Sequence, residues 1–474
     1  ALVHRVIHLF NSASRDSPPT SLLNVMAAAG SVLPEDPRRK DAERNLRANL
    51  RDIIETSQEN DVSLLLCTIA SNERGFAPSY AEPLIDTGSL NMWKEMIADG
   101  NTAYEEKRFN IALSHFENAL RLDPQNAWSH FQMGRCLEML GNKTSARNAY
   151  LRARDTDPAP WRASSAINQV IRETAQVEGI TLVDGEVLFT EYSSSVGIGW
   201  DLMDDHVHPS AQGQILLARE VAESVVDLLA VTSDGMKVSD AEYRQIQGET
   251  SLDELAVSHD MYILLSEEPM GEGNELQADR LAERSDSLWN TLTIGERNGY
   301  QRWRKGKGSD LLPLNAADQL FAQGDLARAS TYYRAAALEE PFTPWGDIWA
   351  TLRWGRTRQL SGIFGEEEKE IVETMRARLD FLANTSDLSP GLVNFFYGYS
   401  SFLIEGEGVE LLESAIDDKQ VRRLFFFDLL AILCEKLPED GRQGDAERYV
   451  REITEEIGQI NYGKFLLEQM AHNR

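Results

Sequence analysis

The sequence predicts an α/β domain that is interrupted by helical repeats and followed by an all-helical region. Short apolar runs at 61–70 and 179–184 each follow an amphipathic pattern, at 40–58 and 164–177. Between the two runs lies an internal repeat, and the apolar spacing is helical from residue 309 onward. Strand-sized runs that alternate with helices favour a parallel sheet, whereas repeats of this length are typical of paired helices.

The first apolar run is expected to form a buried parallel strand, because nearly all its residues are apolar. It includes Leu64 to Cys67 and ends in a polar loop that contains Asn72. In open α/β sheets, ligands bind at the carboxyl ends of the strands. Asn72 is therefore a candidate residue lining a substrate site.

The segment 93–158 repeats itself with a period of 34 residues, which resembles two tetratricopeptide repeats. Small residues allow paired helices to approach, an aromatic residue fills the gap between them, and a proline ends the second helix. The alternatives are a peptide-binding groove and a spacer or docking surface, of which the second is favoured because two repeats make a short groove. The matching positions are Gly100, Ala112, Phe116, Ala119 and Pro124, then Gly134, Ala146, Tyr150, Ala153 and Pro158.

The motif Asp205-His206-Val207-His208-Pro209 is predicted to form a loop before an amphipathic helix at 212–229. An aspartate three residues before a histidine can turn back and hold the imidazole in one tautomer, as catalytic bases require. The alternative is a turn aspartate and a histidine that caps the next helix. No role is assigned to His206, and no third ligand accompanies the two histidines, so a metal site is not expected.

Bulk properties exclude several function classes. A net charge of −29 disfavours nucleic-acid and anionic-lipid binding, both of which need a basic face. The three cysteines, Cys67, Cys136 and Cys434, have neither metal-ligand nor disulfide spacing, and no cofactor motif is present. No apolar run is long enough to span a membrane.

Beyond the second α/β segment, the sequence predicts an acidic connector and then a degenerate helical array. The connector contains one basic and aromatic cluster, 300–307, which either contacts an acidic partner or is simply solvated. Trp345, Trp349 and Trp354 are expected in the core, because their spacing is that of ordinary helix packing. Array positions that fit the repeat template are Ala317, Gly324, Ala329, Tyr333, Ala336, Pro341, Gly355 and Gly362.

The combination of Thr68-Ile69-Ala70-Ser71-Asn72, the repeat insert, Thr181-Leu182-Val183-Asp184 and the Asp205–Pro209 motif resembles the repeat-containing bacterial SGNH/GDSL hydrolases. The resemblance implies a flavodoxin-like sheet of five parallel strands and ester hydrolysis by a Ser, a His and an Asp. His208 matches the family's general base and Asp205 its orienting acid, while Asn72 is a weak match for an oxyanion-site residue. The family's Gly-Asp-Ser nucleophile block occurs nowhere in the chain.

The missing serine and the small number of strands lead us to expect that upstream sequence, or another polypeptide, completes the α/β domain. The expected function is hydrolysis of an O-acyl ester, on a glycan or lipid. The alternative is an inactive hydrolase remnant that serves as a scaffold and binds protein partners. The resemblance also favours an extracytoplasmic or membrane-anchored protein. The expected domains are 1–92 with 159–232 (hydrolase-like), 93–158 (repeat insert), 233–308 (connector) and 309–474 (helical array).

Overall fold

The computed structural model describes residues 31–193, 196–231, 238–339, 345–385 and 388–472. Within these ranges the chain forms 22 helices and two strands, and it divides into two compact units. The first unit comprises residues 1–243 and 255–287, and the second comprises 244–254 and 288–474. No helix in the described part of the chain has the length and apolar character that a bilayer span requires.

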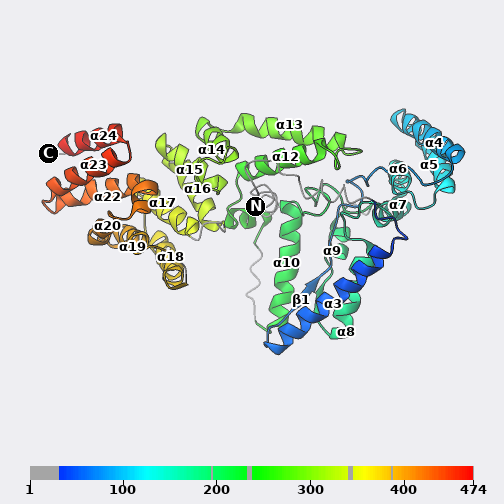
Figure 1. The fold of residues 1–474 in the computed structure, drawn as a ribbon, viewed down its shortest axis with the longest axis horizontal. Coiled ribbons are helices and arrows are strands. Elements are labelled where there is room, and N and C mark those ends of the chain that lie inside the picture. Colours follow the sequence, from blue (N-terminus) through cyan, green and yellow to red (C-terminus); the bar gives the residue numbers. More distant parts are fainter. Residues whose placement is uncertain (1–30, 194–195, 232–237, 340–344, 386–387, 473–474) are drawn as a thin grey trace. The chain divides into compact units, whose positions relative to one another are not determined.

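The two predicted strands form and pair in parallel, with Leu66 opposite Leu182. β1 (Leu65–Cys67) and β2 (Thr181–Val183) have three residues each, and most of these residues are only half buried. Helices α3 (Pro37–Glu59) and α8 (Ser165–Glu178) lie side by side against the strands (Figure 1). The expected five-stranded, flavodoxin-like domain is not shown, because the described residues supply only this pair of strands.

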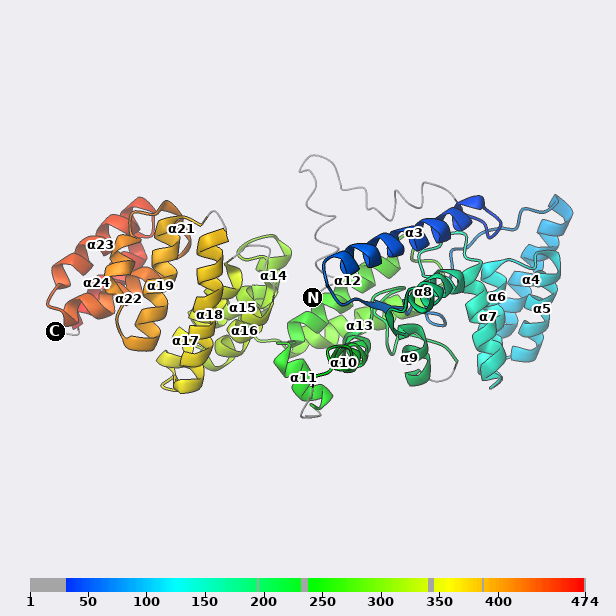
Figure 2. The same ribbon diagram turned by 90° about the horizontal axis from the view of Figure 1, so that it is seen from below.

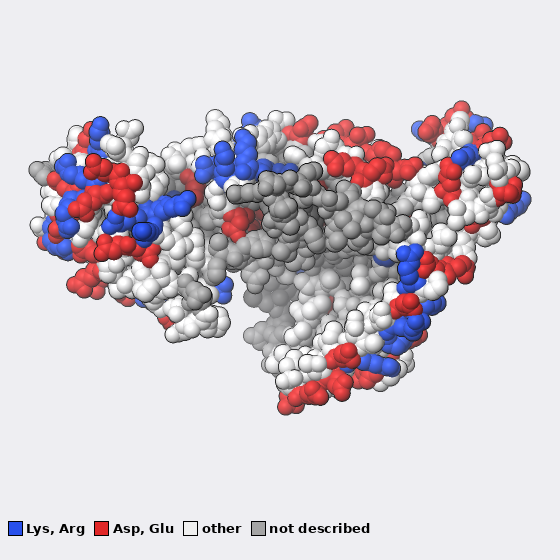
Figure 3. All heavy atoms as spheres, in the orientation of Figure 1, with Lys and Arg blue, Asp and Glu red and all other residues white. Residues whose placement is uncertain are grey.

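The local sequence explains where these elements begin and end. Asp36 accepts a hydrogen bond from the backbone of Arg38 and so caps α3, whose first turn starts at Pro37. α8 ends at Gly179, whose φ of 67° is left-handed. Charges of both signs alternate along the outer face of α3 (Figure 3), which keeps this face solvated while Ile54 packs inward.

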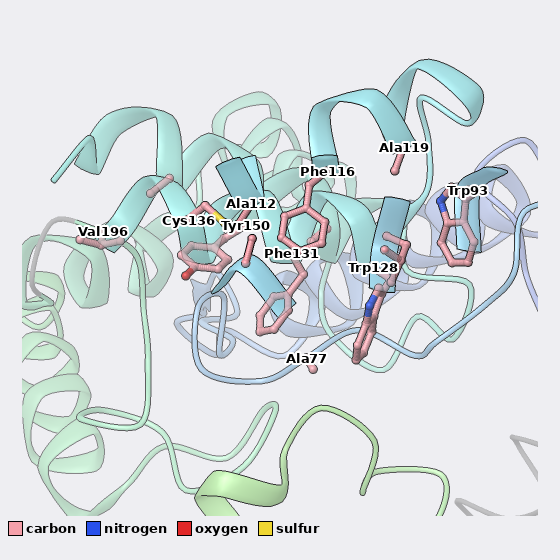
Figure 4. Packing of buried hydrophobic residues seen from close by; sticks show 14 residues of the cluster. Ala77, Trp93, Ala112, Phe116, Ala119, Trp128, Phe131, Cys136, Tyr150 and Val196 are labelled. Carbon is pink, nitrogen blue, oxygen red and sulfur yellow. The ribbon is translucent and has the colours of Figure 1, made fainter. Parts of the chain in front are cut away.

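The repeat insert forms two helical hairpins that stack in sequence order (Figure 2). Figure 4 shows Phe116, Phe131 and Tyr150 filling the space between the helices, and the ring centroids of Phe131 and Tyr150 are 5.6 Å apart. A Cβ added to Gly134 would lie 2.8 Å from the ring of Tyr150, so the glycine permits this close packing. The helices are α4 (Thr87–Glu105), α5 (Phe109–Leu122), α6 (Ala127–Met139) and α7 (Lys143–Asp155).

After β2 the chain forms α9 (Gly185–Tyr192), the loop with the Asp205 motif, and α10 (Ala211–Leu228). The described part of the predicted connector, from residue 238, contains four helices, and two of them form a hairpin whose tip carries the acidic side chains seen in Figure 3. Buried residues of this hairpin, such as Met261 and Leu265, pack on Phe76 of the first unit. The four helices are α11 (Asp240–Ile246), α12 (Ser251–Ser266), α13 (Glu275–Thr291) and α14 (Ile294–Arg304).

The second unit is an array of antiparallel helices whose core includes Trp349 and Trp354, as expected. Gly324 lies in the turn between two helices with a φ of 80°, whereas the repeat position Pro341 lies outside the described residues. The array comprises α15 (Leu312–Ala322), α16 (Leu326–Leu338), α17 (Gly346–Leu360), α18 (Glu366–Thr385), α19 (Pro390–Glu405), α20 (Val409–Ser414), α21 (Lys419–Leu424), α22 (Phe426–Glu439), α23 (Gln443–Glu456) and α24 (Ile460–His472).

Candidate functional site

The predicted histidine loop is a closed turn in front of α10. Met203 and Pro209 form an antiparallel bridge, and the backbone N–H of Asp204 donates to the carbonyl of His208 at 2.9 Å. The hydroxyl of Ser210 then accepts from the N–H of Gly213 and caps α10. Only glycine fits at position 213, because a Cβ would lie 2.4 Å from the carbonyl oxygen of Leu202. The loop is therefore held at both ends.

Asp205 and His208 meet within this loop. Nδ1 of His208 lies 2.6 Å from Oδ2 of Asp205, and the other carboxylate oxygen accepts the backbone N–H groups of Val207 and His208 at 2.7 Å each. Asp205 is buried, whereas 26% of the His208 side chain is exposed. The buried aspartate holds the Nδ1 edge of the partly exposed imidazole, so Nε2 is directed away from the aspartate. This is the arrangement of a general base.

The electrostatics of the pair agree with this geometry. The bond to Asp205 raises the pKa of His208, and burial opposes this effect. Burial alone would raise the pKa of Asp205, but the bond from His208 and the neighbouring histidines hold it below its usual value. Asp205 is therefore ionised at neutral pH, and it stabilises a proton gained by His208.

His206 is a different kind of histidine from His208. It is buried against the rings of Phe76 and Trp161, with centroids 5.3 and 6.4 Å away, and burial lowers its pKa to about 4. Its Nδ1 has no hydrogen-bond partner within the described residues. In the same ranges no group of three or more His, Cys, Asp or Glu side chains is placed to hold a metal ion. His206 is thus an uncharged, buried side chain that packs beside Asp205 and His208.

Asn72 lies against the back of the loop, although 133 residues separate it from Asp205. Its side-chain amide donates to the carbonyl of Asp205 at 3.1 Å, and its backbone N–H donates to the carbonyl of His206 at 3.1 Å. Its side-chain oxygen accepts the N–H groups of Gly75 and Phe76. The structure therefore brings Asn72, Asp205 and His208 together, with Asn72 fully buried as a support. The prediction that Asn72 lines the substrate site stays a prediction.

Several residues that surround the site were not identified from the sequence. Arg162 and Asp157 form a buried ion pair beneath the segment that begins at Asn72. Ser71 is fully buried and its hydroxyl has no partner among the described residues. Burial and the adjacent Asp205 raise the pKa of Asp204 to about 7. Of these residues, only Asp157 could have been noticed in the sequence, because it directly precedes Pro158 at the end of the second repeat.

A cavity of about 360 Å³ opens beside His206, within the size range of ligand pockets. Two of its lining residues, Phe76 and Trp161, also contact the His206 ring. Its other walls come from the residues that lead into α3, the two segments that flank the repeat insert and the loop between α12 and α13. The remaining lining residues are Ser31, Val32, Arg38, Ala77, Pro78, Ser79, Tyr80, Ala81, Pro158, Ala159, Pro160, Glu268, Pro269, Met270, Glu272 and Asn274.

The site as described has an acid–base pair without a nucleophile. No hydroxyl or thiol in the described ranges hydrogen bonds to His208, which bonds instead to Asp205 and to the backbone of Asp204. The arrangement can accept a proton at Nε2 and return it, and it can stabilise the resulting imidazolium. Attack on a carbonyl would require a serine from elsewhere.

Comparison with known proteins identifies the repeat insert. A tetratricopeptide-repeat family model matches residues 103–167, which overlaps the two hairpins and confirms the predicted repeat. No curated protein matches the chain. Neither finding indicates an SGNH/GDSL hydrolase. The structure and the family match together show a largely helical protein with a tetratricopeptide segment.

Proposed function

We propose that Asp205 and His208 are the acid–base half of a serine-type ester hydrolase that acts on O-acyl esters. The observation that supports this proposal is the 2.6 Å contact between Nδ1 of His208 and the buried carboxylate of Asp205. Because the sequence contains no Gly-Asp-Ser block, the serine of this proposal comes from a further polypeptide segment. The cavity beside His206 is the proposed place for the acyl group or for the glycan or lipid alcohol that carries it.

In the proposed reaction, Nε2 of His208 removes the serine proton as the serine oxygen attacks the ester carbonyl. The tetrahedral intermediate collapses, the carbon–oxygen bond to the alcohol breaks, and the imidazolium returns the proton to the leaving alcohol. Water then attacks the acyl-enzyme with His208 again as base, which releases the carboxylic acid and the free serine. Asp205 keeps Nδ1 protonated and stabilises each imidazolium.

The test compares His208→Ala with the wild type in the complete genomic reading frame, using p-nitrophenyl acetate. Loss of a general base lowers turnover by about 10²–10⁴-fold. His115→Ala is the matched control, because His115 is, like His208, a half-buried histidine, and it lies in the repeat insert. Equal turnover by wild type and His208→Ala would refute the proposal.

A second proposed function is the binding of protein partners through the helical repeats, with or without an active hydrolase. The family match to residues 103–167 supports this function more directly than any finding supports hydrolysis. On the insert, the guanidinium of Arg135 lies 4.3 Å from the Tyr104 ring centroid, so α4 and α6 share one partly exposed polar and aromatic face.

Peptides selected from a displayed library against the whole chain would test partner binding. Arg135→Glu should weaken peptides that use the α4 and α6 face, whereas Arg451→Glu, an exposed change on α23, should not. Equal binding to both variants would place recognition elsewhere and contradict this function for the insert.

A further inference from the structure

The repeat insert ends in a buried ion pair. Nη2 of Arg162 donates to Oδ2 of Asp157 at 3.1 Å, and the two side chains are 1% and 2% exposed. Burial raises the pKa of Asp157 to about 6 and lowers that of Arg162, and each charge counteracts the shift of the other. Because the desolvation of such a pair is costly, its contribution to stability alone is a weak explanation for its presence.

The pair is bonded to the backbone of the segment 72–79. Nη1 of Arg162 donates to the carbonyls of Asn72 and Phe76 at 2.9 and 2.8 Å. Oδ1 of Asp157 accepts the N–H of Ser79 at 3.2 Å. Three backbone groups of one irregular segment are thus fixed by two side chains, and all three lie outside helices and strands.

The same segment supports the histidine loop. Asn72 donates its side-chain amide to Asp205 and its backbone N–H to His206. A continuous chain of hydrogen bonds therefore runs from Asp157 through Arg162 and Asn72 to the backbone of Asp205. The step lengths along this chain are 3.1, 2.9 and 3.1 Å.

The first repeat offers an internal comparison. Asp123 occupies the position of Asp157 one period earlier, directly before Pro124. Its carboxylate accepts the N–H of Gln125 at 3.1 Å, a local bond at the exposed surface of the insert. Asp157 is instead buried and forms an ion pair with Arg162, which contacts Asn72. The geometry is therefore specific to the repeat that joins the hydrolase-like part.

We propose that Asp157 and Arg162 are positioning residues, which hold the Asn72 segment so that Asp205 keeps its contact with His208. The catalytic meaning of this inference rests on the proposed function, but the hydrogen-bond chain can be tested without it. It gives the end of the repeat insert a second role, as a support for the acid–base pair.

The test is an NMR titration of histidine-labelled chain, with the His208 signal assigned by its loss in His208→Gln. In Asp157→Asn, the amide still accepts from Ser79 but leaves Arg162 without a counter-charge. The His208 pKa should then fall toward its usual value, since its raised pKa depends on the Asp205 contact. The Asn72 amide should exchange about tenfold faster or more. Asp123→Asn should change neither.

The double variant Asp157→Asn with Arg162→Met separates positioning from stability and also serves if the single variant does not fold. The double variant should have a higher free energy of unfolding than Asp157→Asn, because it no longer leaves the Arg162 charge buried without a partner. The double variant also lacks the Arg162 donors to Asn72 and Phe76, so the His208 pKa should stay lowered. A wild-type His208 pKa in the folded single or double variant would overturn the proposal. Absence of esterase activity in the wild type would refute only the proposed hydrolysis.

Discussion

Replacement of Gly134 by alanine should destabilise the first unit by about 1–2 kcal/mol. The new Cβ would lie 2.8 Å from two ring carbons of Tyr150. This ring cannot move away freely, because Tyr150 is 1% exposed and its hydroxyl donates to Glu138 at 2.7 Å. Overpacking of this kind costs about 1–3 kcal/mol, and the better helix propensity of alanine returns up to about 1 kcal/mol.

Urea unfolding followed by circular dichroism measures the effect, with Gly444→Ala as the control. Gly444 lies in the first turn of α23, and no atom lies within 4 Å of the position that a Cβ would take, so alanine should stabilise the second unit by about 0.5–1 kcal/mol. If Gly134→Ala stabilised the first unit as much as Gly444→Ala stabilises the second, the claim that helix packing requires Gly134 would be refuted. It would also weaken the physical interpretation of the 34-residue repeat.

Two further predictions concern buried charge. Asp204 has a folded-state pKa of about 7, above its usual 3.8, so it favours folding at low pH and this contribution is lost as the pH rises through 7. Asp204→Asn should therefore raise the free energy of unfolding, measured by urea titration, by roughly 2 kcal/mol at pH 8 and by much less at pH 5. A lower free energy of unfolding at pH 8 would contradict the burial argument. Asp428→Asn should destabilise the second unit by about 3 kcal/mol, because Asp428 accepts two bonds from buried Arg353, at 2.7 and 2.8 Å. Asp440→Asn, at an exposed position, is the control. Equal unfolding midpoints for Asp428→Asn and Asp440→Asn would refute the prediction.

The sequence predicted those features whose signals are local or repeated. The contact of Asp205 with His208 spans three residues, so a turn brings the two together whatever the rest of the fold does. The repeat was recognisable because Gly100 and Gly134 each face an aromatic ring at the same spacing, and the pattern occurs twice. Local chemistry of this kind does not depend on knowledge of distant neighbours.

Long-range features of the site were not predictable in this way. Arg162 contacts Asn72 across 90 residues, and no spacing rule connects them. The sequence predicted only an acidic connector where the α12–α13 hairpin lies, because the apolar residues of α12 are buried on several sides of the helix. Leu252, Ala256 and Met261 are all buried, so the helix lacks the one-sided apolar stripe that marks an amphipathic helix.

The short parallel pair has a consequence for the behaviour of the chain in solution. In the described residues β1 and β2 pair only with each other, so the outer edge of each strand presents backbone groups without a ladder partner. Such edges accept additional strands, whether from the same polypeptide, from a separate fragment or from another copy. Register is also fixed by only three residue pairs, and a shift of one strand by one residue would turn its buried side chain, Leu66 on β1 or Val183 on β2, to the other face. Strand complementation, in which an added segment suppresses self-association, is therefore an accessible property of this sheet.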